Sequence, residues 1–77
     1  MHDVIETSVT AIWAQILGVE EPPWTASFYE LGGTSIMAEQ IASRIEDALA
    51  VKLTGIDVLR NHQLGDLVRT VRTKLGA

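Results

Sequence analysis

The chain has 77 residues, 47% of them hydrophobic, and no cysteine, so it can form one small domain with a thin core. The absence of cysteine excludes a disulfide framework, a cysteine nucleophile and a thiolate zinc site. A formal net charge of -4 disfavours binding to nucleic acid and to anionic membrane surfaces. No apolar stretch approaches the length of a membrane span, and the N-terminus lacks signal-peptide features, so we expect a cytoplasmic protein.

The first predicted element is an amphipathic helix that begins near Val4 and ends at Gly18. Asp3 or His2 lies near its start, where an acidic side chain suits the exposed amides. Gly18 is well placed to end the helix in a left-handed conformation. The apolar residues with helical spacing are Ile5, Val9, Ile12 and Ile16, with Trp13 and Leu17 widening the stripe.

Residues 19–34, VEEPPWTASFYELGGT, show no sustained period and contain two prolines and two glycines. This pattern predicts a long loop with one helical turn around residues 28–31. Ordered loops of this length are uncommon in small domains and tend to be functional. The apolar side chains that we expect to hold the loop on the core are Trp24, Phe28, Tyr29 and Leu31.

A second helix is predicted from Ser35 to Ala50. Its apolar side carries Ala38, Ile41, Ala42, Ile45 and Leu49. Ile36 departs from this pattern, because it lies on the polar face directly after Ser35, and Met37 lies at the edge of the apolar stripe.

Two further helices complete the predicted fold. Thr54 can cap a short helix from Gly55 to Leu59, and Asn61 marks a turn. The last helix carries Leu64, Leu67, Val68, Val71 and Leu75 on one face. We therefore expect a single all-α domain over residues 1–77, a small four-helix bundle with a long loop between the first two helices and a short third helix.

The glycine pair before the second helix is the candidate functional site. Gly32 and Gly33 permit a sharp turn, and Thr34 and Ser35 then occupy the helix entrance, where unpaired amides accept a capping hydroxyl or a phosphate. Either hydroxyl can provide the cap. The pattern of a nucleotide-binding loop and that of a nucleophile elbow are both absent, so we expect no catalysis by Ser35. His2 and His62 are far apart and lack the spacing of paired ligands, so no metal site is expected.

The stretch FYELGGTSIMA resembles the carrier-protein signature of nonribosomal peptide synthetases. The matching residues are Phe28, Leu31, Gly32, Gly33, Ser35, Ile36 and Ala38. The resemblance covers nearly the whole chain and implies a peptidyl carrier protein, or thiolation domain, with a fold of acyl-carrier type. It also implies that a phosphopantetheinyl transferase attaches 4'-phosphopantetheine from coenzyme A to Ser35, which the loop of Gly32, Gly33 and Thr34 presents.

The same resemblance implies a non-catalytic, monomeric carrier that holds an aminoacyl or peptidyl group as a thioester. Its partners would be adenylation enzymes and condensation or tailoring enzymes of nonribosomal peptide and antibiotic biosynthesis. Ile36 and Met37 are candidate partner contacts, and Gln40 and Arg44 share that face.

The chain departs from the family's pattern before its final helix, where His62 and Gln63 stand in place of the common Pro and Thr, which predicts a weak cap.

Three alternatives to a peptidyl carrier are an acyl or aryl carrier of a polyketide or siderophore pathway, an unmodified helical interaction module, and a helix-turn-helix DNA binder, which the acidic balance disfavours.

Overall fold

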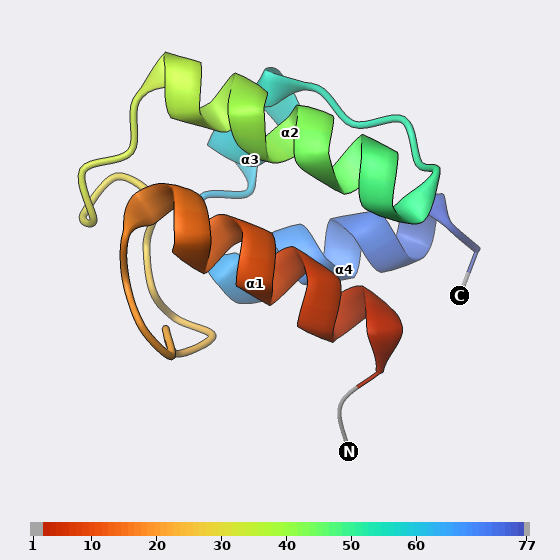
Figure 1. Ribbon diagram of the computed structural model, residues 1–77, viewed down its shortest axis with the longest axis horizontal. Coiled ribbons are helices and arrows are strands. Elements are labelled where there is room, and N and C mark those ends of the chain that lie inside the picture. Colours follow the sequence, from red (N-terminus) through yellow and green to blue (C-terminus); the bar gives the residue numbers. More distant parts are fainter. Residues whose placement is uncertain (1–2, 77) are drawn as a thin grey trace.

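The computed structural model describes residues 3–76, and within them the chain forms four helices and no strand. The helices are α1 (Val4–Leu17), α2 (Ser35–Leu49), α3 (Gly55–Arg60) and α4 (Leu64–Lys74). α1 packs against both α2 and α4, and α3 packs on α2 (Figure 1). The long loop lies at the end of the bundle where α1 ends and α2 begins. The predicted all-α fold with a long first loop and a short third helix is confirmed.

α1 begins and ends where its capping residues predict. The Asp3 carboxylate accepts a hydrogen bond from the Glu6 N–H at 2.7 Å, and Gly18 is left-handed with φ 71°. His2, the other residue expected near the start, lies outside the described residues. Asp3 also accepts a hydrogen bond from the Arg72 guanidinium at 2.6 Å, which lowers the pKa of Asp3 below its ordinary value of 3.8. This ion pair ties the start of α1 to the end of α4.

The ends of α2 and α3 each differ from prediction by one residue. α2 stops at Leu49 because Ala50 is left-handed, with φ 53°. α3 continues through Arg60 and begins with a capping box, in which Thr54 Oγ1 accepts from the Asp57 N–H at 3.3 Å. The Asp57 carboxylate in turn accepts from the Thr54 N–H at 2.9 Å. These paired bonds stabilise the start of a helix only six residues long.

The apolar faces of all four helices meet in one core. Its fully buried side chains include Val9, Trp13, Ile41, Ile45, Val58, Leu64, Leu67 and Val71. On α1 the predicted stripe is displaced, because Ile5, Ile12 and Ile16 are only partly buried. α1 packs between α2 and α4, so Trp13, which was expected at the margin of the stripe, lies at the centre of its buried side.

Backbone groups of the long loop cap the start of α4. The Leu64 N–H donates to the Ala26 carbonyl at 3.1 Å. The Gly65 N–H donates to the Trp24 carbonyl at 2.9 Å. Gln63, the residue before α4, makes no side-chain cap, as the sequence predicts. The loop carbonyls therefore satisfy amides that a capping side chain would otherwise serve.

Phe28 is the side chain that fixes the loop to the core. Its ring is fully buried, and its N–H donates to the His62 carbonyl at 2.7 Å. Of the three further side chains expected to hold the loop, Tyr29 does so through its hydroxyl, which donates to the Leu59 carbonyl of α3 at 3.2 Å. Trp24 and Leu31 remain 47% and 37% exposed, so the expectation is wrong for them. The backbone bonds to α4 already order the loop, and the predicted turn after residue 27 leaves Tyr29 and Leu31 at the surface.

The two glycines before α2 are required for different reasons. Gly32 has φ 84°, a conformation that residues with a Cβ rarely adopt. A Cβ at Gly33 would instead collide with the ring of Phe28. The Gly33 N–H also donates to the Phe28 carbonyl at 2.8 Å. The chain can thus pass over the buried ring and enter α2 only with glycine at position 33.

Gly33→Ala should lower the free energy of unfolding by about 1–3 kcal/mol, because the added methyl group must displace the Phe28 ring from a packed core. Gly32→Asn is the matched control, since asparagine tolerates the left-handed conformation and a Cβ at position 32 meets no atom within 4 Å. Its cost should stay below about 1 kcal/mol. Urea denaturation measures both changes, and equal losses would contradict the assigned role of Gly33.

Candidate functional site

Ser35 is the first residue of α2, and it is exposed at the end of the bundle where the long loop arrives (Figure 1). The residue before it, Thr34, is the N-cap: its backbone is extended and its hydroxyl accepts from the Met37 N–H at 3.2 Å. Among residues 3–76 the Ser35 hydroxyl has no hydrogen-bond partner. Thr34 therefore stabilises the helix, and the Ser35 hydroxyl stays available to a reactant.

The first turn of α2 suits an anion. The Thr34 hydroxyl serves one of the leading amides, that of Met37, and the Thr34 carbonyl accepts the first regular helical bond, from the Ala38 N–H at 2.9 Å. The N–H groups of Ser35 and Ile36 remain for an external acceptor. The first turn carries no acidic side chain, so the positive end of the helix dipole is not neutralised by the chain itself. A phosphate group on Ser35 fits this environment.

The structure brings no base to Ser35. His62 is the only histidine among the described residues, and its contacts lie with the loop. Its Nδ1 is 3.5 Å from the Ser27 hydroxyl, and its ring centroid is 5.6 Å from that of Tyr29. No base–nucleophile pair of the kind found in serine hydrolases is therefore formed within residues 3–76.

Apolar side chains lie exposed beside Ser35. Ile36 is 73% exposed on the outer face of α2, as predicted, whereas Met37 is partly buried against the core. Sequence reasoning missed Ile56 of α3, which is 58% exposed. It follows Gly55, which lies against the side chain of Glu39, one helical turn after Ser35. The only signal in the sequence was the isoleucine itself. A helix of six residues is too short for periodicity to show that this side chain faces solvent.

Two further properties concern the described part of the chain alone. Within it, no group of three or more histidine, aspartate or glutamate side chains is arranged to hold a metal ion. None of its helices combines the length and the apolar composition that a bilayer crossing requires.

Comparison with known proteins assigns the domain. A family model described as "Phosphopantetheine attachment site" matches residues 7–71. A linear gramicidin synthase of Brevibacillus parabrevis is 45% identical over 67 residues, which are 87% of this chain and 1% of that protein. Phosphinothricin tripeptide synthetase PhsC of Streptomyces viridochromogenes is 32% identical over 69 residues, 90% of this chain and 6% of that protein. The chain thus spans a small fraction of these relatives.

Solved structures share the fold. BlmI, a type-II acyl carrier protein of Streptomyces verticillus involved in bleomycin biosynthesis, has a TM-score of 0.84 at 30% identity, covering 92% of this chain and 86% of BlmI. A nonribosomal PCP domain has a TM-score of 0.75 at 25% identity, covering 90% of this chain and 88% of that one. The family model covers most of the chain, and relatives above 30% identity are peptide synthetases, so the chain is homologous to the carrier domains of nonribosomal peptide synthetases. The chain belongs to the phosphopantetheine attachment family, whose members are non-catalytic carrier domains that bind 4'-phosphopantetheine covalently on a serine.

Proposed function

We propose that Ser35 is the residue that receives 4'-phosphopantetheine, and that the domain carries an aminoacyl or peptidyl group as a thioester in nonribosomal peptide biosynthesis. The observation that carries this proposal is the free, exposed Ser35 hydroxyl at the start of α2, where Thr34 supplies the cap. Ser35 lies within the segment that matches the family model, and the relatives are peptide synthetases.

Attachment requires a phosphopantetheinyl transferase and coenzyme A. The Ser35 oxygen forms the new bond to phosphorus, adenosine bisphosphate leaves, and the hydroxyl proton passes to a base of the transferase. Gly32 and Gly33 let the loop pass over the Phe28 ring and enter α2, and the amides of Ser35 and Ile36 would be available to the added phosphodiester. The bound group supplies the thiol that forms the thioester, which this cysteine-free chain has no residue to form.

The partners that we propose are the transferase, an adenylation enzyme and condensation or tailoring enzymes, acting on a monomeric domain of residues 1–77 in the cytoplasm. Ile36 is the main contact, because an apolar side chain that is 73% exposed next to the modified residue has little structural role. Met37 contributes at the margin, since part of its side chain packs on the core.

Incubation with coenzyme A, magnesium and a broad-specificity transferase should add the mass of one phosphopantetheine group to the wild-type chain. Ser35→Ala should abolish this gain, and the matched control Ser43→Ala, which removes another exposed hydroxyl of α2, should keep it. Intact-mass spectrometry reads the result. An unmodified wild-type chain, or a gain retained in Ser35→Ala, would exclude Ser35 as the attachment residue.

Ile36→Ala should lower kcat/KM of the chain as a substrate of the transferase or of its adenylation enzyme by about fivefold or more, the effect of truncating an apolar contact worth roughly 1 kcal/mol. Its unfolding free energy should change little, because the side chain is 73% exposed. Val4→Ala is the matched control, since Val4 is 72% exposed on α1. Unchanged turnover by both enzymes would show that Ile36 is not a partner contact.

A further inference from the structure

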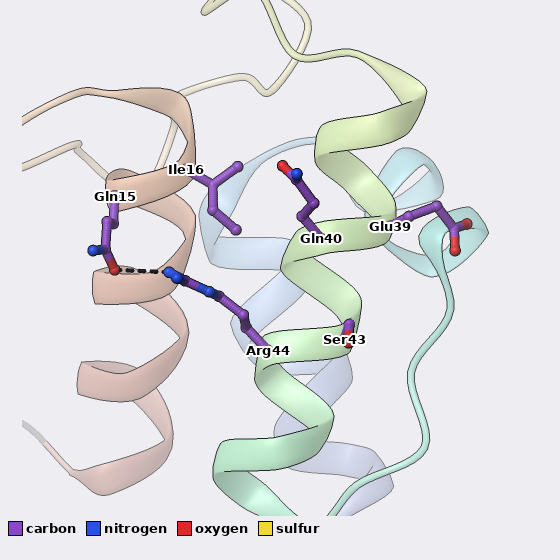
Figure 2. A pocket seen from close by; sticks show the side chains of 6 residues that line it. All are labelled: Gln15, Ile16, Glu39, Gln40, Ser43 and Arg44. Carbon is purple, nitrogen blue, oxygen red and sulfur yellow. Dashed lines mark hydrogen bonds between the residues drawn. The ribbon is translucent and has the colours of Figure 1, made fainter.

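A groove of about 610 Å³ lies between α1 and α2. Its lining residues are Gln15, Ile16, Glu39, Gln40, Ser43 and Arg44. Figure 2 shows Ile16 of α1 and Gln40 of α2 extending into the space between the two helices. Next to them, Arg44 Nη1 donates to Gln15 Oε1 at 2.9 Å and bridges the helices.

The groove begins one helical turn from Ser35. Residues four apart are neighbours on a helix surface. Ser35, Glu39 and Ser43 therefore form one row along α2, and Ile36, Gln40 and Arg44 form the adjacent row. These two adjacent rows supply all the α2 residues that line the groove.

The groove lies within reach of a group attached to Ser35. Arg44 lies about 14 Å along α2 from Ser35, at 1.5 Å per residue. The phosphopantetheine arm is a chain of bonds similar in length to those of an extended polypeptide backbone, in which three bonds span about 3.5 Å. When extended, the arm therefore reaches on the order of 15 Å. A group on Ser35 can therefore extend as far as Arg44.

The lining matches the chemistry of the arm, which contains two amides, a hydroxyl and a pair of methyl groups. Gln40 offers an amide donor and acceptor. Gln15 offers its amide donors, because its Oε1 already accepts from Arg44, and the guanidinium of Arg44 has further donors. Ile16 provides an apolar surface between the glutamines. A groove with one apolar side chain among six suits a polar arm better than a long hydrocarbon chain.

We propose that the α1–α2 groove is the resting site of the phosphopantetheine arm, with Gln40 and Arg44 contacting its amides and Ile16 its apolar atoms. This inference rests on attachment at Ser35, and it assigns the two α2 side chains a role toward the arm rather than toward a partner enzyme. The row of Gln40 and Arg44 starts at Ile36, close to the point where the arm enters the groove. An enzyme that binds over Ile36 would therefore also contact the arm there.

Nuclear magnetic resonance of isotope-labelled apo and holo chains tests the site. Intact mass first confirms full modification, so failed attachment is recognised separately from a failed groove. The holo chain should show nuclear Overhauser effects from the arm to Ile16 and Gln40, and amide shift changes at Gln15 and Arg44. Shift changes confined to residues 33–37, or contacts of the arm on the α3 side at Ile56, would overturn the proposal.

Thiol reactivity provides a second readout, because the chain has no cysteine and the arm carries the only thiol. In the holo form, the double variant Gln40→Ala/Arg44→Ala should react with an aromatic disulfide about threefold to tenfold faster than wild type, as expected for the loss of one or two hydrogen bonds. Asp47→Ala, an exposed carboxylate of α2 outside the groove lining, should react at the wild-type rate. Equal reaction rates in all three chains would contradict a resting site in the α1–α2 groove. Nuclear magnetic resonance spectra of the apo forms verify that each variant is folded.

Discussion

Phe28 packs its fully buried ring beneath Gly33, and this contact sets the position of Thr34 and Ser35 at the start of α2. The ring anchors a loop of sixteen residues whose other large apolar side chains stay partly exposed. Because Gly33 can lie directly on the ring, Thr34 arrives in the extended conformation that an N-cap requires. Ser35 is then the first helical residue, with its side chain in solvent. A small packing requirement in the core thus determines where the reactive hydroxyl is presented.

The two adjacent hydroxyls have separate roles. The Thr34 hydroxyl accepts the capping hydrogen bond from the first turn of α2, so the Ser35 hydroxyl does not need to act as the cap. An attachment residue needs exposure, a nearby positive dipole end and an accessible apolar neighbour, but it does not need a base of its own. These requirements explain a site without histidine or cysteine, in a family whose members carry groups and leave the chemistry to enzymes.

Much of this arrangement could be predicted from the sequence. Apolar spacing located three of the helices to within a residue at most ends, and Thr54 and Asn61 located the short α3. The stretch FYELGGTSIMA identified the family and the candidate serine. Periodicity assigns a helix face but not the helices on either side, so it misplaced Trp13 of α1. The carbonyls of Trp24 and Ala26 that cap α4 have no side-chain signature, because any residue type could supply them. The groove beside Gln40 depends on how α1 and α2 pack, which no local pattern contains.

The central claim is that Thr34 caps the helix while Ser35 accepts the phosphopantetheine group. Fragmentation of the modified chain by tandem mass spectrometry tests this most directly, because it separates two neighbouring hydroxyls that intact mass cannot distinguish. We predict that every fragment containing Ser35 carries the added group and that fragments ending at Thr34 do not. Detection of the group on Thr34, or on Ser43 further along α2, would contradict the claim.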